Sequence, residues 1–187
     1  RRIESEIGPV DVLVNNAGIT RDNMFRKMQS TDWNAVIDVN LTGTWHTVVA
    51  SLPHLRTAGG GSVIAICSIS GVEAAAGIGH YVASKHGVVG LVKTLANEQC
   101  ANGITCNAVA PTGVGTTMIL NDTLYGIFNA EDPSQDNMAA ILTAAHAIPE
   151  PWIEPEDVTG VVLFLASDDA KKMTGGVVKV DMGYLSR

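Results

Sequence analysis

The sequence predicts an α/β fold in which helices cover both faces of a doubly wound parallel sheet. Of the 187 residues, 46% are hydrophobic and 17% are charged, which supplies enough apolar material for one large core. Short runs rich in Val and Ile alternate with longer amphipathic segments along the whole chain, and this alternation is typical of parallel sheets. No internal repeat interrupts the pattern, so residues 1–187 are expected to form a single domain.

The expected strands are short and apolar. They cover residues 10–14, 62–67, 104–110 and 177–180. Helices are expected over residues 31–56, 80–102 and 155–166, the first of them capped by Ser30 or Thr31. Pro155 suits the first position of the last helix, since that position has no hydrogen bond to lose.

The segment 112–154 is long for a connection inside a compact domain. It is predicted to hold one or two short helices and to serve as a substrate-binding loop or lid, because long loops of this kind usually carry function.

Composition excludes several classes of protein. The net charge is −7 and no cluster of Lys or Arg is present, which argues against a nucleic-acid partner. The longest apolar run, Val161 to Ala166, is far too short to span a membrane. Three cysteines give no disulfide framework and indicate a cytoplasmic protein. The five histidines show no metal-ligand spacing, so no metal is expected.

Tyr81 and Lys85 form the strongest chemical signal. One turn apart on a predicted helix, they share a face. A nearby ammonium favours a phenolate, so Lys85 is expected to lower the pKa of Tyr81 and make it a general acid/base. A chance pair on an exposed helix is the alternative.

Two further polar residues belong to the same hypothesis. Ser68 ends a predicted strand thirteen residues before Tyr81, and ligands of parallel sheets bind at the carboxyl ends of strands. Asn40 lies inside a predicted helix, where Asn is a poor helix former. Ser68 could instead be a turn residue, and Asn40 a polar residue that merely bends the helix.

Together with Asn15-Asn16-Ala17-Gly18 and Asn107-Ala108-Val109-Ala110-Pro111, these residues resemble the short-chain dehydrogenase/reductase family in order and spacing. The resemblance covers essentially the whole chain and implies a Rossmann-like fold. It makes Tyr81 the acid/base, with Ser68 bonded to the substrate oxygen, Lys85 on the nicotinamide ribose and Asn40 holding a water of the proton relay. The resemblance also implies a set of residues that contact the cofactor: Asn16, Ala17, Gly18, Tyr81, Lys85, Pro111, Val114 and Thr116.

The chain departs from the family pattern at two places. Thr112 follows Pro111 where the family usually has Gly. The Gly-rich turn that would cradle the pyrophosphate is absent, and the glycines at 59–61 follow a helix rather than a strand. We therefore expect a domain that is truncated at its N-terminus and lacks the dinucleotide-binding segment, roughly the first third of the family's fold.

The likeness is uneven along the chain. Residues 10–43 resemble 3-oxoacyl carrier-protein and acetoacetyl-CoA reductases. Residues 44–187 resemble the carveol-dehydrogenase type, the mycofactocin-coupled subfamily, which also has Thr after the proline and a long substrate loop. A recombined sequence would explain the mixture.

The resemblance implies an oxidoreductase that interconverts a hydrophobic secondary alcohol and its ketone with NAD, NADP not being excluded. A 3-oxoacyl thioester reductase is the alternative within the enzymes. A catalytically silent fragment that cannot hold the dinucleotide is the alternative of another class. The outer faces of the two long helices are expected to pair with a second subunit and give a homodimer or homotetramer.

Overall fold

A parallel sheet of four strands forms the centre of the molecule. The computed structural model describes residues 2–186, and within them β1 (Val12–Asn15), β2 (Gly61–Ile66), β3 (Ile104–Pro111) and β4 (Val177–Val180) pair in the order β1-β2-β3-β4. Every pairing is parallel. All carboxyl ends therefore point to one edge of the sheet.

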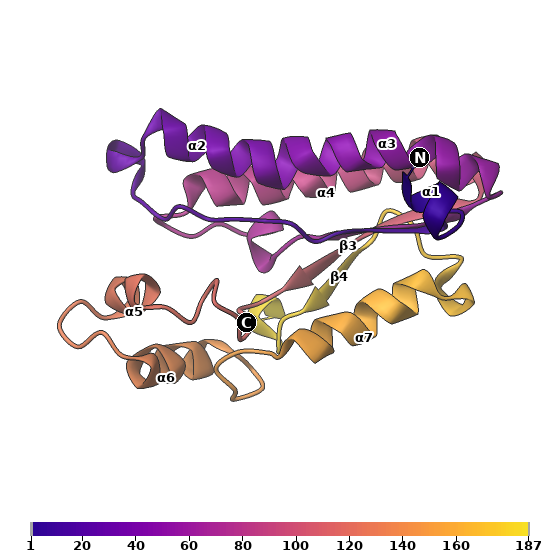
Figure 1. The fold of residues 1–187 in the computed structure, drawn as a ribbon. Coiled ribbons are helices and arrows are strands. Elements are labelled where there is room, and N and C mark those ends of the chain that lie inside the picture. The colour runs from indigo at the N-terminus through magenta and orange to yellow at the C-terminus, as the bar shows by residue number, and fades with distance from the viewer. Residues whose placement is uncertain (1, 187) are drawn as a thin grey trace.

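Helices cover both faces of this sheet, as the sequence predicted. In Figure 1, α2 (Ser30–Ile37), α3 (Gly43–Thr57) and α4 (Gly79–Gln99) lie on one side, and α7 (Pro155–Ala166) lies on the other. Two short helices, α5 (Asp122–Phe128) and α6 (Gln135–Ala145), lie beyond the end of the sheet. They confirm the helices expected within residues 112–154. A short α1 (Arg2–Glu6) precedes β1.

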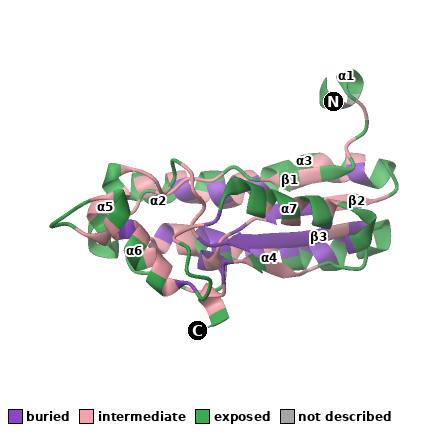
Figure 2. Ribbon diagram, turned by 90° about the horizontal axis from the view of Figure 1, so that it is seen from below, coloured by how far each residue is buried: buried purple, intermediate pink, exposed green. Residues whose placement is uncertain are grey.

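Strand alternation divides the core into two layers. Val63 and Ala65 of β2 pack toward α3 and α4, whereas Ile64 and Ile66 pack toward α7. The strand β3 is almost completely buried, as Figure 2 shows. Burial on both faces explains why these strands read as continuous apolar runs.

The crossover from β3 to β4, which contains α7, has the opposite handedness to the crossovers from β1 to β2 through α3 and from β2 to β3 through α4. The strand order never reverses, yet α7 lies on the opposite face of the sheet from α3 and α4. Crossovers that advance in the same direction on opposite faces have opposite hands. The substrate segment 112–154 belongs to this unusual connection.

Three local expectations are corrected. The first strand begins at Val12 rather than at residue 10. Neither Ser30 nor Thr31 caps α2, because the N-cap is Gln29 and its side chain makes no capping bond. The helix expected over 31–56 is interrupted by a π-helical turn at Asp38–Thr42.

The glycines before β2 allow two backbone segments to approach closely. Gly61 has φ +145, and a Cβ there would lie 2.2 Å from the Asp11 carbonyl oxygen. Only glycine fits a position of this kind. None of the described helices is long and apolar enough to cross a membrane.

We expect Gly61→Ala to destabilise the fold by about 1–3 kcal/mol or more, because it adds backbone strain and a clash with Asp11. Gly160→Ala on α7 is the matched control: a Cβ there meets open space. The control should stabilise by about 0.5–1 kcal/mol through helix propensity. Urea denaturation of both variants measures the difference, and equal stabilities would contradict this account of Gly61.

Candidate active site

The carboxyl ends of three strands bring the predicted site residues to one edge. Asn16, Ala17 and Gly18 follow β1, Ser68 comes two residues after β2, and Pro111 is the last residue of β3. Parallel pairing of β1 with β2 and of β2 with β3 keeps these strand ends side by side. The structure therefore brings together loops that are about 50 and 40 residues apart in the chain.

Tyr81 reaches this edge from the first turn of α4. The side chain of Ser68 lies close enough to its hydroxyl to lower the pKa of Tyr81 as a hydrogen-bonding neighbour. The Ser68 Oγ also accepts a bond of 3.1 Å from the backbone N–H of Ser70, which fixes the serine on its loop. The two side chains predicted to meet one substrate oxygen are thus neighbours at this edge.

Lys85 lies one turn beyond Tyr81 and is buried, with 4% of its surface exposed. Its Nζ donates a 2.9 Å hydrogen bond to the carbonyl oxygen of Ile66 at the end of β2. The same atom lies 5.4 Å from the centroid of the Tyr81 ring. The ammonium therefore joins α4 to β2 directly beneath the tyrosine.

The pKa of Tyr81 differs from the sequence-based expectation. Lys85 was expected to lower it, but removal from water raises the pKa of Tyr81 to about 12. The hydrogen bond from Ser68 acts in the opposite direction, and the charge of Asp22 adds to the increase. Burial also lowers the pKa of Lys85, which lies over the ring rather than at the hydroxyl. At neutral pH Tyr81 is accordingly a protonated donor.

Asn40 is buried in the π-helical turn and acts as a clamp. Its Oδ1 accepts a 2.8 Å bond from the N–H of Ile19, and its Nδ2 donates to the Ile19 carbonyl at 3.0 Å and to Ser84 Oγ at 3.1 Å. The side chain is thereby occupied by protein partners. The π-helical turn shows that the helix is irregular at Asn40, and the role as a water anchor stays a prediction.

The predicted cofactor residues fit the nicotinamide half of a dinucleotide. Lys85 Nζ has three N–H groups and one acceptor among the described residues, so two donors remain for the hydroxyls of a ribose. Gly18 lies beside it, since a Cβ there would be 3.6 Å from Nζ. Val114 pairs with Ile153, and Thr116 lies partly buried at the start of the substrate segment.

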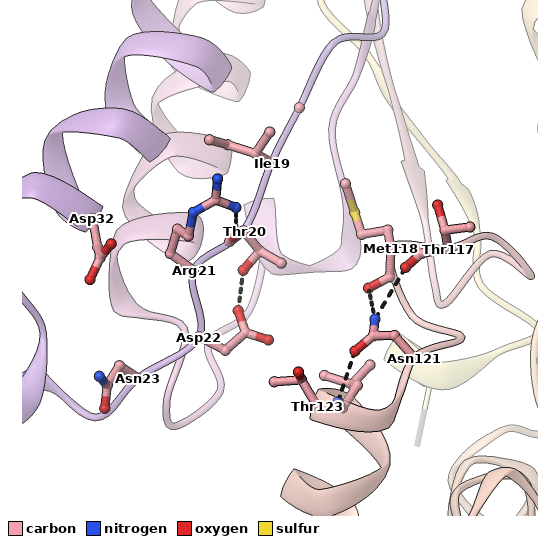
Figure 3. A pocket seen from close by; sticks show the side chains of 12 residues that line it. Ile19, Thr20, Arg21, Asp22, Asn23, Asp32, Thr117, Met118, Asn121 and Thr123 are labelled. Atoms are coloured by element: carbon pink, nitrogen blue, oxygen red, sulfur yellow. Dashed lines mark hydrogen bonds between the residues drawn. The ribbon is translucent and has the colours of Figure 1, made fainter.

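A cleft of about 600 Å³ opens next to these residues (Figure 3). One wall is formed by residues 18–23, and the other by residues of the substrate segment between Thr117 and Leu124. Ser68, Tyr81 and Lys85 do not line the cleft itself, but Gly18 of its wall lies beside Lys85, and the charge of Asp22 in the same wall acts on Tyr81. This arrangement would accommodate a substrate between the site and the segment 112–154.

Thr112, the departure from the family pattern, takes part in a buried bond that the sequence did not reveal. Its Oγ1 lies 2.8 Å from Nε2 of the buried His146, and His146 Nδ1 donates to the Glu150 carbonyl at 2.8 Å. Because a carbonyl can only accept, Nδ1 carries the proton and the Thr112 hydroxyl donates to Nε2. The ring also meets the edge of Tyr184. The far end of the substrate segment is thereby fixed to the end of β3.

Across residues 2–186 no group of three or more His, Cys, Asp or Glu side chains is placed to hold a metal ion. Cys67, next to Ser68, is buried, and burial raises the pKa of its thiol. Its Sγ donates to the Lys85 carbonyl at 3.4 Å. Cys67 is thus a buried cysteine directly after β2.

Known proteins are similar to this chain in sequence and in fold. A family model described as "Enoyl-(Acyl carrier protein) reductase" matches residues 1–185. A short-chain type dehydrogenase/reductase of Mycolicibacterium smegmatis is 42% identical over 184 residues, which are 96% of this chain and 66% of that protein. This chain belongs to the short-chain dehydrogenase/reductase family.

Both likenesses noted in the sequence have counterparts among members of this family. (-)-trans-Carveol dehydrogenase of Rhodococcus erythropolis is 39% identical, covering 97% of this chain and 67% of that protein. An acetoacetyl-CoA reductase of Rhizobium meliloti is 40% identical, covering 97% and 70%. The division near residue 44 stays a prediction.

A solved structure agrees closely. Carveol dehydrogenase from Mycobacterium avium in complex with NAD superposes with a TM-score of 0.96 at 40% identity, and the match covers 98% of this chain and 68% of that one. The chain thus spans about two thirds of the length of the relatives it matches.

We expect Thr112→Val to lower the free energy of unfolding by about 1–3 kcal/mol, because it leaves the buried His146 Nε2 without a donor. Thr94→Val, at an exposed position of α4, makes the same chemical change and should stay within about 0.5 kcal/mol of the parent. Thermal or urea unfolding provides the measurement. A Thr112→Val variant as stable as the control would show that the pair contributes nothing.

The raised pKa of Tyr81 predicts a specific dependence of stability on pH. Its folded value of about 12 lies above the ordinary 10.0, so its contribution is complete below about pH 10 and is lost as the pH rises toward 12. The parent should therefore lose stability more steeply than Tyr81→Phe between about pH 9 and about pH 11. Urea denaturation at both pH values tests this, and parallel losses would contradict it.

Proposed function

We propose that this protein is an NAD(P)-dependent oxidoreductase that interconverts a hydrophobic secondary alcohol and its ketone. The observation that carries the proposal is the grouping of Tyr81, the neighbouring Ser68 and the buried Lys85, whose Nζ lies 5.4 Å from the centroid of the tyrosine ring. A proton donor, a second hydroxyl and a cation converge there on one edge of the sheet. Family membership supports the same reaction class.

Each residue has a distinct task in this reaction. During reduction the Tyr81 hydroxyl, which is protonated at neutral pH, gives its proton to the carbonyl oxygen. During oxidation at alkaline pH the tyrosinate takes the proton of the alcohol. Ser68 donates a hydrogen bond to the same oxygen and so holds it next to Tyr81. The dinucleotide, when bound, supplies or accepts the hydride at the carbon. The desolvated surroundings of Tyr81 strengthen these hydrogen bonds.

The same edge would hold the nicotinamide ribose. Lys85 offers its two remaining N–H groups to the ribose hydroxyls, and Asn16, Ala17 and Gly18 form the loop beside it. Pro111, Val114 and Thr116 would border the nicotinamide from the β3 side. We propose NAD as the cofactor, in keeping with the NAD complex of the similar carveol dehydrogenase, and NADP stays open.

The substrate class rests on the segment 112–154, which forms one wall of the cleft. Its Thr112 and its length favour a carveol-type alcohol over the 3-oxoacyl thioesters of the acetoacetyl-CoA reductases. Oxidation of trans-carveol with NAD, measured beside reduction of acetoacetyl-CoA with NADH and NADPH, separates the two. Calorimetric titration with the three dinucleotides identifies the remaining alternative, a silent fragment that binds none of them.

Replacing Tyr81 tests the acid/base assignment. Tyr81→Phe should lower kcat by about 10²–10⁴-fold, because it removes the transferable proton while keeping the ring. Tyr125→Phe in α5 is the control and should leave kcat within a few-fold, since that hydroxyl bonds to Gln135 outside the strand-end site. A Tyr81→Phe variant as active as the control would refute the assignment.

We further propose that the protein works in the cytoplasm as a homodimer or homotetramer. The outer surface of α3 exposes Trp45 and Val49, each 49% exposed, whereas Val88 and Val92 of α4 are buried in the core. Exposed large apolar side chains on one helix favour an interface.

Sedimentation at micromolar concentration should therefore show a dimer or tetramer, and Trp45→Glu should shift the population toward monomer. Lys27→Glu, an exposed charge change outside α3 and α4, is the comparison for the effect of added negative charge. A parent protein that sediments as a monomer would refute the assembly.

A further inference from the structure

His80, the residue before Tyr81, is completely buried and uses both of its ring nitrogens. Its Nδ1 lies 2.7 Å from the backbone N of Tyr81, and its Nε2 lies 2.6 Å from the carbonyl oxygen of Arg21. A backbone N–H can only donate and a carbonyl can only accept. Nδ1 is therefore the acceptor, Nε2 carries the proton, and the ring is neutral in a single tautomer.

The Nδ1 bond replaces a missing helix cap. The first N–H groups of a helix have no partner within the helix and are usually capped by Ser, Thr, Asp or Asn. The N-cap of α4 is Ile78, which offers no side-chain acceptor. His80 supplies that acceptor from inside the first turn, and the group that it caps is the N–H of Tyr81 itself.

The Nε2 bond joins this turn to the wall of the cleft. Arg21 belongs to the loop 18–23 that lines the cleft in Figure 3. The same loop meets the start of α4 at a second point, where the Asn23 N–H donates to the Gly77 carbonyl at 2.7 Å. One imidazole thus connects the backbone of Tyr81 to the loop that would face the substrate.

We propose that His80 is a positioning residue for Tyr81. Its neutral ring fixes the backbone of Tyr81 relative to the cleft wall. One ring nitrogen bonds to the Tyr81 N–H and the other to the Arg21 carbonyl. The catalytic consequence rests on the proposed function, but the two bonds do not. If His80 only filled space, neither the Tyr81 N–H nor the Arg21 carbonyl would need a ring nitrogen as its hydrogen-bond partner.

Two conservative variants separate the two bonds. In His80→Asn, Oδ1 can stand where Nδ1 stands, so the cap on Tyr81 is kept and the bond to Arg21 is lost. In His80→Gln, the terminal amide can reach the Arg21 carbonyl, so the loop bond is kept and the cap is lost. His80→Ala loses both bonds. If His80→Ala does not fold, the comparison of His80→Asn with His80→Gln still tests the proposal.

Amide hydrogen exchange by NMR tests both ends without any assay of activity. The Tyr81 amide is bonded to His80 directly, whereas the Asn23 amide, bonded to the Gly77 carbonyl, reports on the loop that the Arg21 bond holds. In His80→Gln the Tyr81 amide should exchange about tenfold faster or more, with the Asn23 amide unchanged. In His80→Asn the Asn23 amide should accelerate and the Tyr81 amide should not. Equal exchange at Tyr81 in the parent and in His80→Gln would overturn the proposal, even if the protein proves to be an active dehydrogenase.

Kinetics then test the catalytic consequence with the alcohol as substrate. His80→Gln should lower kcat by about 10–100-fold with little change in KM, because only the reacting hydroxyl is displaced. His80→Asn should mainly raise KM, since the cleft wall is loosened. Equal effects of the two variants on kcat and KM would refute the positioning role. If the variants show the expected exchange pattern but the parent protein has no dehydrogenase activity, the proposed function and the catalytic role of His80 are refuted. The two hydrogen bonds of His80 would then still stand.

Discussion

The buried ammonium of Lys85 is the constraint around which the strand-end site is arranged. A cation removed from water must find acceptors, and the Ile66 carbonyl at the end of β2 provides one. That bond holds α4 across the end of β2 and brings Tyr81 against Ser68. Close packing around it leaves no room for a side chain at Gly71, where a Cβ would lie 2.3 Å from Cys67 Sγ.

The loop after β1 is held by buried polar side chains from two separate helical segments. Asn40 is hydrogen-bonded to both the N–H and the carbonyl of Ile19, and His80 is hydrogen-bonded to the carbonyl of Arg21. Because buried polar groups are costly when unpaired, these bonds select one loop conformation. The cleft wall therefore has a fixed position relative to Tyr81, although it is formed by irregular backbone.

The substrate segment is fixed to the sheet in the same way. Thr112 stands at the end of β3 and His146 at the end of α6, and their bond closes the segment that contains both short helices. The ring of Tyr184 packs against His146, and burial together with the nearby charge of Glu73, on the loop after Ser68, raises the pKa of its hydroxyl. The C-terminal residues thus lie between the substrate segment and the loop after β2.

The sequence by itself determined the layered architecture and the core of the site. The spacing of apolar residues and the positions of Gly and Pro predicted the ends of all four strands to within about two residues, and Pro155 marked the start of α7. Ser68, Tyr81 and Lys85 were predictable because a residue at a strand end and two residues on one turn of the following helix can converge, and because their spacing resembles that of a known family. Only the tertiary structure decided the direction of the Tyr81 pKa, which depends on burial by distant segments. It also decided the roles of Asn40, His80 and Thr112, whose hydrogen-bond partners lie 21, 59 and 34 residues away in the chain, beyond any local pattern.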